Sequence, residues 1–136
     1  LLVPLATVVT PNSMEAQRLC GDADSLEACA QQLMAQGAEY VFITGGHENT
    51  PDIVNRLWGH RKLVSEYSQT RLPGEFHGTG CTLASAIAGY LAHGATVTTA
   101  IRDAQAYTAR AVAHARRLGM GQLIPNRLAW CTERNS

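Results

Sequence analysis

The sequence predicts an α/β fold whose central sheet is mainly parallel. Three observations support this prediction. Short β-branched or apolar runs alternate along the chain with segments of helical periodicity. A continuous apolar run ended by two glycines, residues 39–47, is typical of a parallel strand covered on both faces. Small residues follow a second glycine-rich turn and permit close packing of a helix against a sheet.

The chain opens with a predicted strand and a short helix. Residues 6–12 (ATVVTPN) form a β-branched run that Pro11 stops, which indicates a buried strand ending in a turn. A helix is expected over about 13–20, closed by a glycine. Asn12 and Glu15 flank its first turn with the spacing of a capping box.

A second helix is predicted within residues 22–37. Asp24 is placed to cap its N-terminus, Glu27 follows three residues later, and Gly37 is a natural end. An apolar stripe runs along it through Leu26, Cys29, Ala30, Leu33 and Met34. The strand 39–47 (EYVFITGGH) comes next and is the strongest strand signal in the chain.

The second half is predicted to contain a hairpin and two helices. Residues 52–59 and 62–70 alternate in part around Gly-His-Arg, as antiparallel strands of a hairpin do. Helices follow over about 80–93 and about 97–117, and residues 118–136 are expected to be irregular. Only two strands have parallel character, which is few for such a sheet.

Composition narrows the class of protein. The 136 residues suit a single domain spanning 1–136, and 46% are apolar. Eleven basic and eleven acidic residues balance, which argues against nucleic acid as a partner. The arginines near the end of the chain are interpreted as a solvated helix face: Arg102, Arg110, Arg116 and Arg117.

The cysteines and the apolar runs indicate the cellular compartment that the sequence favours. None of the four cysteines forms a C-x-x-C pair or has zinc-ligand spacing with histidine, which favours a reducing, cytoplasmic setting. The five histidines share no spacing, and most are interpreted as surface residues. No apolar run approaches the length of about 20 residues that spans a bilayer, so no membrane partner is expected. The chain starts in mid-pattern without Met, which suggests a piece of a longer protein.

The turn Gly78-Thr79-Gly80-Cys81 is the most specific motif. Two glycines let the backbone approach a ligand closely, and a helix N-terminus favours an anion, so the turn could hold a phosphate. A cysteine at a helix N-terminus is favoured as the thiolate, so Cys81 could act as a base. The alternative is a glycine-rich helix entry with a small buried cysteine.

Two further motifs follow predicted strands. Asn12 and Glu15 either form only the capping box or also orient the water ligands of Mg²⁺, since open α/β sheets bind ligands at the carboxyl edge of their strands. Thr44-Gly45-Gly46 precedes His47 after the best strand, and backbone N–H groups of such a turn can meet phosphate oxygens. The alternative there is a plain strand-to-loop turn. Neither a Walker A pattern nor GxGxxG occurs.

The order of these segments resembles a known family. VVTPNSMEAQRL, VFITGGH and FHGTGCTLASAIAGYLAHG, followed by an Ala-rich helix, are similar to the C-terminal half of hydroxymethylpyrimidine/phosphomethylpyrimidine kinase, a thiamine-pathway enzyme of the ribokinase-like superfamily. The resemblance extends to about residue 120. The HGTGCTL block is specific because ribokinase relatives more often carry Asp where Cys81 stands. The implied fold is half of a three-layer α/β/α sandwich.

The resemblance also implies an activity. ATP with Mg²⁺ would phosphorylate 4-amino-5-hydroxymethyl-2-methylpyrimidine and then its monophosphate. Gly78, Thr79 and Gly80 would form the anion hole for the phosphoryl group, and Cys81 would take the position of the catalytic base. Asn12 and Glu15 match the family's N-x-x-E motif, which is associated with Mg²⁺ and phosphate. Thr44, Gly45 and Gly46, with Thr79, would line the ATP phosphates, and the two C-terminal helices would border the adenine.

Two departures from the family pattern matter. The family often has Lys where Thr44 stands, so another cation would have to compensate. The family's N-terminal half, which supplies most of the pyrimidine pocket, is not in this sequence and would act in cis or in trans. The strand edge around Thr7–Thr10 would then be unpaired. The resemblance further implies a homodimer of the full-length enzyme.

Two other functions remain open on the sequence. One is a kinase of the same fold with another acceptor, such as pyridoxal. The other is a non-catalytic binding or assembly fragment.

Overall fold

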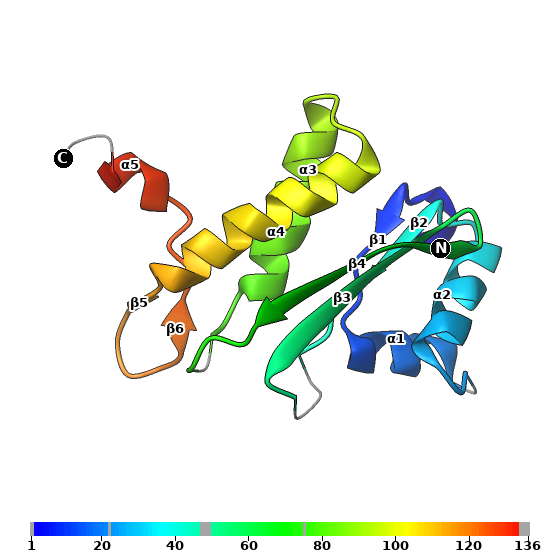
Figure 1. The fold of residues 1–136 in the computed structure, drawn as a ribbon, viewed down its shortest axis with the longest axis horizontal. Coiled ribbons are helices and arrows are strands. Elements are labelled where there is room, and N and C mark those ends of the chain that lie inside the picture. The colour runs from blue at the N-terminus through cyan, green and yellow to red at the C-terminus, as the bar shows by residue number, and fades with distance from the viewer. Residues whose placement is uncertain (1, 22, 47–49, 75, 134–136) are drawn as a thin grey trace. The chain divides into compact units, whose positions relative to one another are not determined.

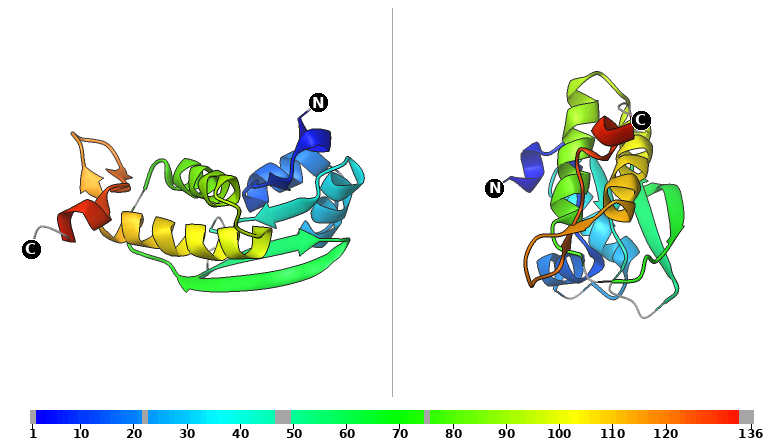
Figure 2. Two further views of the ribbon diagram at one scale, coloured as in Figure 1. Left: turned by 90° about the horizontal axis from the view of Figure 1, so that it is seen from above. Right: turned by 90° about the vertical axis from the view of Figure 1, so that its left-hand side faces the viewer.

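The computed structural model describes residues 2–21, 23–46, 50–74 and 76–133 (Figures 1 and 2). The chain forms two compact units, residues 1–71 and 72–136. The first holds η1 (Val3–Leu5), β1 (Val8–Val9), α1 (Ser13–Cys20), α2 (Leu26–Ala35), β2 (Tyr40–Ile43), β3 (Asp52–Gly59) and β4 (Lys62–Thr70). The second holds α3 (Thr79–Ala92), α4 (Val97–Ala113), β5 (Arg116–Arg117), β6 (Leu123–Ile124) and α5 (Ala129–Glu133).

The sheet of the first unit is mixed, not mainly parallel as predicted. Its order is β1-β2-β3-β4. β1 runs parallel to β2, with Val8 opposite Tyr40, whereas β2–β3 and β3–β4 are antiparallel. Val41, Phe42 and Ile43 are buried as the apolar run predicted, but burial on both faces does not fix the direction of the neighbouring strand. β1 is an edge strand, with β2 as its single strand neighbour among the described residues.

Helices α1 and α2 lie beside one another next to β1 and β2 and supply one hydrophobic core (Figure 1). Small side chains let the two helices approach closely, because Ala16, Cys29 and Ala30 have no exposed surface. The same cluster includes Leu33 on α2, Val41 and Ile43 on β2, and Trp58 on β3. The predicted apolar stripe of the second helix therefore faces this core.

The predicted helix boundaries hold in the first unit, with one correction. α1 spans Ser13–Cys20 as expected. α2 begins later than expected, because its cap is Ser25 and not Asp24: the Ser25 hydroxyl accepts a hydrogen bond from the N–H of Ala28 at 3.1 Å. Gly37 follows the helix with φ +117°, as a glycine at that position should.

The hairpin β3–β4 is confirmed, and its turn is formed by His60 and Arg61. Both residues adopt positive φ in the left-handed region, 51° at His60 and 60° at Arg61. The Tyr40 ring lies across Gly59, where an added Cβ would come within 2.5 Å of the ring. The Tyr40 hydroxyl is 3.2 Å from Nε2 of His60, so the neighbouring strand supports the turn.

The second unit is built on an antiparallel pair of helices, since α3 and α4 lie side by side in both views of Figure 2. α4 ends at Ala113, four residues before the predicted end, because Arg116 and Arg117 form the exposed strand β5 paired with β6. The interpretation of these two arginines as part of a helix face is therefore wrong. The expectation that residues 118–136 are irregular is wrong as well, since β6 and α5 lie there.

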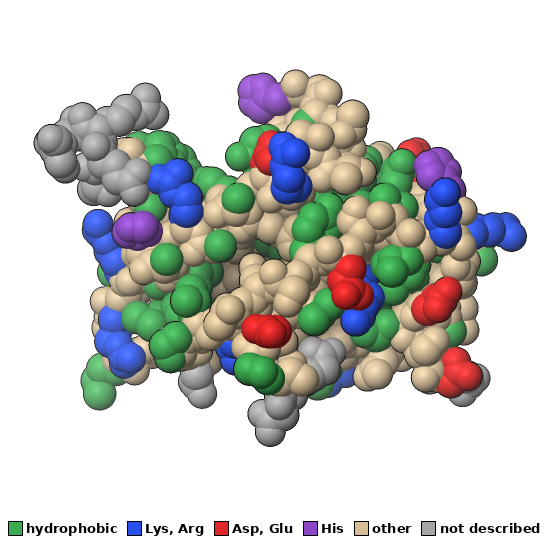
Figure 3. Space-filling view, viewed as in Figure 1, with side chains coloured by type: hydrophobic (Ala, Val, Ile, Leu, Met, Phe, Trp, Pro, Cys, Tyr) green, Lys and Arg blue, Asp and Glu red, His purple; other side chains and the backbone are tan. Residues whose placement is uncertain are grey.

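The surface matches the balanced composition. On the face drawn in Figure 3, acidic and basic side chains are interspersed and neither sign forms a continuous patch. His60, His77, His93 and His114 are exposed, as expected, and His47 lies outside the described residues. None of the helices in the described part of the chain combines the length and apolar character needed to cross a bilayer.

Two of the cysteines, Cys20 and Cys29, are neighbours in the core. The Cys20 thiol donates to the carbonyl oxygen of Cys29 at 3.5 Å. Burial, with a smaller contribution from Cys29, raises the pKa of Cys20 from 9.0 to about 11. Because the folded state holds this proton more tightly than the unfolded state, the stabilisation is complete below pH 9 and is lost between pH 9 and about 11.

We therefore expect the free energy of unfolding to fall as pH rises through that window. Urea titrations at a series of pH values should show the fall, and Cys20→Ala should reduce its slope. Thiolate absorbance gives an independent measurement, since Cys20 should ionise in the folded protein only near the top of the window. Equal slopes for the two proteins would contradict the prediction.

Candidate functional site

The N-terminus of α3 has no side-chain cap. Gly78 occupies the cap position in the left-handed conformation, with φ 85° and ψ 9°, which favours glycine. The other long helices are capped by side chains, those of Asn12, Ser25 and Thr96. The first helical hydrogen bond of α3 runs from the N–H of Thr82 to the carbonyl of Gly78 at 3.0 Å. The N–H groups of residues 79–81 therefore lack acceptors within the helix and can meet an anion.

Cys81 is exposed and lies in the first turn of α3. The alternative interpretation, a small buried cysteine behind a glycine-rich turn, is therefore wrong. Gly80 precedes it, and a Cβ added there would meet nothing within 4 Å. The turn is thus open to a ligand on the side of Gly80, and the thiol is accessible from solvent.

Asn12 and Glu15 form the predicted capping box. The N–H of Glu15 donates to Oδ1 of Asn12 at 2.8 Å, and the N–H of Asn12 donates to Oε2 of Glu15 at 2.9 Å. Capping is therefore confirmed as one role of this pair. Glu15 is exposed, and its other carboxylate oxygen has no hydrogen-bond partner among the described residues.

The structure brings the first two motifs together at the same end of β1 and β2. Asn12 pairs with Thr44 in an isolated parallel bridge. The N–H of Thr44 donates to the carbonyl of Pro11 at 3.0 Å, and the N–H of Ser13 donates to the carbonyl of Thr44 at 2.9 Å. The capping box and the start of the Thr44–Gly46 turn are therefore neighbours at the carboxyl edge, where open α/β sheets bind ligands. Residues 78–81 belong to the second unit.

Two residues that the sequence analysis did not single out hold the Gly45-Gly46 turn. Asn55, buried on β3, accepts a hydrogen bond from the N–H of Gly45 at 3.0 Å. Arg71 donates from Nη1 to the carbonyl of Gly46 at 2.8 Å and from Nε to the carbonyl of Thr50 at 3.2 Å. A polar residue at an inward position of β3 was the available signal for Asn55. Arg71 had no local signal, because its contacts are 25 and 21 residues away.

Arg127 is a third residue missed by the sequence analysis, and it reaches the turn before α3. Its Nε donates to Oγ1 of Thr82 at 3.0 Å, and that hydroxyl donates to the carbonyl of Gly78 at 2.8 Å. The backbone of Arg127 is held from α4, where the Tyr107 hydroxyl donates to its carbonyl at 3.0 Å. Burial is the main reason that the pKa of Tyr107 is raised, which keeps the phenol protonated as this donor requires.

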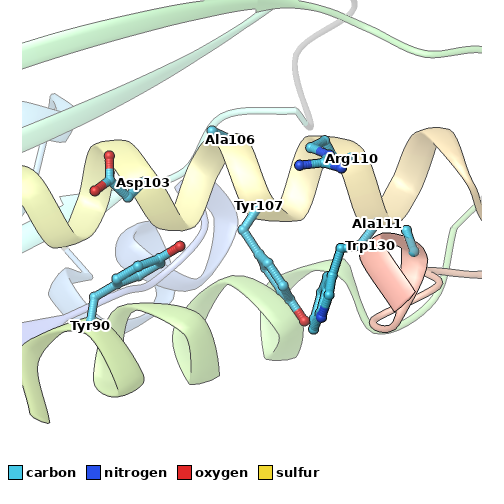
Figure 4. Close-up of a pocket in the computed structure, with 8 residues that line it drawn as sticks. Tyr90, Asp103, Ala106, Tyr107, Arg110, Ala111 and Trp130 are labelled. Atoms are coloured by element: carbon cyan, nitrogen blue, oxygen red, sulfur yellow. The ribbon is translucent and has the colours of Figure 1, made fainter. Parts of the chain in front are cut away.

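A cavity of about 250 Å³ lies among α3, α4 and α5 (Figure 4). Tyr90 comes from α3, Tyr107 and Arg110 from α4, and Trp130 from α5. The rings of Tyr107 and Trp130 are 5.1 Å apart between centroids, in a tilted arrangement. This contact fixes α5 against α4 and so supports the loop that carries Arg127.

A metal ion held by protein ligands alone has no candidate site in the described part of the chain, where no three His, Cys, Asp or Glu residues come together. The chemistry at Glu15 does fit a hydrated ion carried by a nucleotide. Mg²⁺ commonly keeps several waters and binds through one or two carboxylates together with substrate phosphates. One exposed carboxylate with an unused oxygen, fixed by the capping box, meets that requirement.

Comparison with known proteins identifies the family. A family model described as phosphomethylpyrimidine kinase matches residues 1–126. The chain belongs to this family. The match includes every residue of the two strand-end motifs and of the turn before α3, and it confirms the resemblance seen in the sequence.

Phosphomethylpyrimidine kinases and pyridoxine kinases are both among the relatives. The chain is 37% identical to a hydroxymethylpyrimidine/phosphomethylpyrimidine kinase of Rhizobium meliloti, with 89% of this chain and 47% of the relative covered. It is 38% identical to a pyridoxine kinase of Bacillus subtilis, with 82% and 43% covered. An ADP complex of Bacillus subtilis pyridoxal kinase matches with a TM-score of 0.85 at 30% identity, over 96% of this chain and 53% of that structure. The chain thus spans about half the length of these relatives.

Proposed function

We propose that the complete protein is an ATP-dependent kinase that phosphorylates hydroxymethylpyrimidine and then its monophosphate. The observation that carries the proposal is the N-terminus of α3, where a left-handed Gly78 replaces a side-chain cap and Cys81 lies exposed in the first turn. Membership of the phosphomethylpyrimidine kinase family supports the choice of reaction. A turn that binds an anion beside a thiol could serve several kinds of reaction. Phosphoryl transfer is the one that agrees with a kinase family.

The chemistry assigned to the turn is positioning and charge stabilisation, which phosphoryl transfer needs most. The N–H groups of Thr79, Gly80 and Cys81 would hold the equatorial oxygens of the transferring group. The acceptor hydroxyl oxygen forms a bond to the γ-phosphorus while the bond from that phosphorus to the bridging oxygen of ADP breaks. The Cys81 thiolate takes the hydroxyl proton as general base.

The nucleotide phosphates are assigned also to the Thr44-Gly45-Gly46 turn. Gly46 adopts φ 111°, a conformation that favours glycine, and the hydrogen bonds from Asn55 and Arg71 keep the turn in one shape. The solved ADP complex of a pyridoxal kinase with the same fold supports a nucleotide site in this part of the family. The helices α3 and α4 are proposed to border the adenine.

Mg²⁺ is proposed to enter with the nucleotide. Bound Mg²⁺ neutralises phosphate charge. Glu15 would accept hydrogen bonds from its water ligands through the oxygen that the capping box leaves unused, and Asn12 would fix the orientation of Glu15.

The substitution Glu15→Gln separates these two roles of Glu15. A glutamine amide oxygen can still accept the N–H of Asn12, so the capping box closes and the thermal midpoint should stay unchanged. The negative charge that orients the water ligands is lost, so kcat/KM for ATP–Mg²⁺ should fall about 10- to 100-fold. Steady-state kinetics over a range of Mg²⁺ concentrations, with a thermal melt of each protein, provides the measurement.

Glu15→Ala is the comparison for the capping role. It removes both functions, so activity should fall as in Glu15→Gln and the free energy of unfolding should also fall by about 1 kcal/mol. Full activity in Glu15→Gln would leave capping as the only role of this carboxylate.

The identity of the acceptor alcohol distinguishes two candidate kinase activities. Pyridoxine or pyridoxal is the second candidate, and it is favoured by the pyridoxine kinase relative and the pyridoxal kinase structure. ADP production by the complete protein should be measured with hydroxymethylpyrimidine, its monophosphate and pyridoxal in turn. Turnover with pyridoxal and none with either pyrimidine would reject the first choice.

The 136-residue chain itself covers about half of each relative, so its own activity is a separate question. We expect it to bind ATP–Mg²⁺ while lacking turnover, because the resemblance assigns the acceptor pocket to the family's other half. Calorimetry with the isolated chain tests this. Failure to bind the nucleotide would favour a role in assembly for the chain by itself.

A further inference from the structure

Arg127 lies beside the turn before α3 and is connected to it through two successive hydrogen bonds. Its Nε binds Thr82, whose hydroxyl binds the carbonyl of Gly78. Its Nη2 lies 3.4 Å from the position that a Cβ on Gly78 would occupy. The guanidinium therefore lies directly beside the turn whose N–H groups are assigned to the phosphoryl group.

The segment that carries Arg127 is held on both sides of this residue. The N–H of Asn126 donates to the carbonyl of Ala111 at 2.8 Å, and the Tyr107 hydroxyl binds the carbonyl of Arg127. Ala129, at the start of α5, is 2% exposed. The backbone that carries the arginine is thus held in place before any ligand binds, which lowers the entropy lost on binding.

Arg127 is exposed, and its charge has no acidic partner in the part of the chain that the structure describes. Among the described residues, no carboxylate lies within ion-pair distance of Arg127, and neither of its Nη nitrogens has a hydrogen-bond partner. The stretch 72–136 is basic overall, with six arginines against three acidic residues. A guanidinium carries five donors, and one is used here, so a planar pair of donors remains for an anion.

We propose that Arg127 contacts the phosphoryl group held at the Gly78–Cys81 turn and supplies a positive charge to it. This inference rests on the proposed kinase function and adds a phosphate-binding residue to it. The competing explanation is that Arg127 only braces the turn through Thr82. The two explanations predict different losses of affinity when the side chain is removed. Direct contact predicts a larger loss for a nucleotide with a γ-phosphate, whereas bracing predicts equal losses with and without it.

The test compares two nucleotides with the complete protein. Calorimetry measures the affinity for AMP-PCP, which carries a γ-phosphate group, and for ADP, which does not. Arg127→Gln should weaken AMP-PCP binding at least about 10-fold more than ADP binding and should lower kcat/KM for ATP about 100-fold or more. Guanidinium ion added to Arg127→Ala should restore part of the activity, and Arg127→Lys should fall between Gln and the wild type.

Two further variants serve as controls, one for the loss of charge and one for the hydrogen bond to Thr82. Arg18→Gln removes an equal charge from an exposed position of α1 and should leave both affinities unchanged. Thr82→Val removes the Nε acceptor while keeping the guanidinium, so it should have a smaller effect than Arg127→Gln. Equal losses in Thr82→Val and Arg127→Gln would overturn the proposal in favour of bracing. Equal weakening of ADP and AMP-PCP would also overturn it.

The kinase function and the role of Arg127 can fail separately. Absence of ADP formation with every alcohol would reject the proposed function, and the difference between AMP-PCP and ADP binding would still decide on Arg127. An active wild type with an equally active Arg127→Gln would reject the role of Arg127 alone.

Discussion

Replacing Cys81 by alanine should lower kcat of the complete protein about 10²- to 10⁴-fold, the usual contribution of a general base. The affinity for AMP-PCP should stay nearly the same, because the backbone N–H groups that are assigned to the phosphates remain in place. Stability should also be kept, since Cys81 is exposed in the first turn of α3 and alanine is a strong helix former. Steady-state kinetics and calorimetry on the same preparation measure both quantities.

Cys131→Ala is the matched control for this experiment, because Cys131 is also an exposed free thiol. It should have wild-type kcat, which would exclude a general effect of removing a reactive thiol. Near-normal turnover in Cys81→Ala would remove Cys81 from the base role and leave the anion-binding turn without a proton acceptor at that position.

Replacing Leu33 by alanine should produce the largest loss of stability, about 2–5 kcal/mol. Leu33 is 1% exposed and is the largest side chain that α2 contributes to the core. Its neighbours on the helices are small residues such as Ala16 and Ala30, which cannot extend into the cavity that the substitution leaves. Urea denaturation of the two proteins gives the difference in the free energy of unfolding.

Leu19→Ala provides the comparison on α1. Leu19 is 58% exposed, so its loss should change the free energy of unfolding by less than about 0.5 kcal/mol. A similar small change in Leu33→Ala would contradict the assignment of Leu33 to a closely packed core.

Local signals in the sequence predicted the helices well and failed where two signals competed. Asn12 and Glu15 define a capping box that needs no distant partner, and the structure contains it. Asp24 and Ser25 are both good caps, and the choice of Ser25 moved the start of α2. Arg116 and Arg117 leave the predicted helix because pairing with β6 is a contact that helical periodicity cannot report.

The sequence predicted the backbone turns of the candidate site but not the side chains that hold those turns. Glycines indicate turns, so the turns at Gly46 and Gly78 were predicted from the sequence alone. The side chains that hold these turns come from elsewhere: Asn55 from β3, Arg71 from the end of the hairpin, and Arg127 from 45 residues beyond Thr82. No local pattern marks such residues, because their role depends on tertiary contacts.

The tight turn of the β3–β4 hairpin has a consequence for the order of folding. Strands joined by two residues close a short loop, whereas the parallel pairing of Val8 with Tyr40 must close a loop of about thirty residues at a higher entropic cost. We expect the hairpin to form first and β1 to join last. Amide hydrogen exchange should then show the strongest protection in β3 and the weakest in β1, and the bridge from Asn12 to Thr44 would be completed only in the final stage of folding.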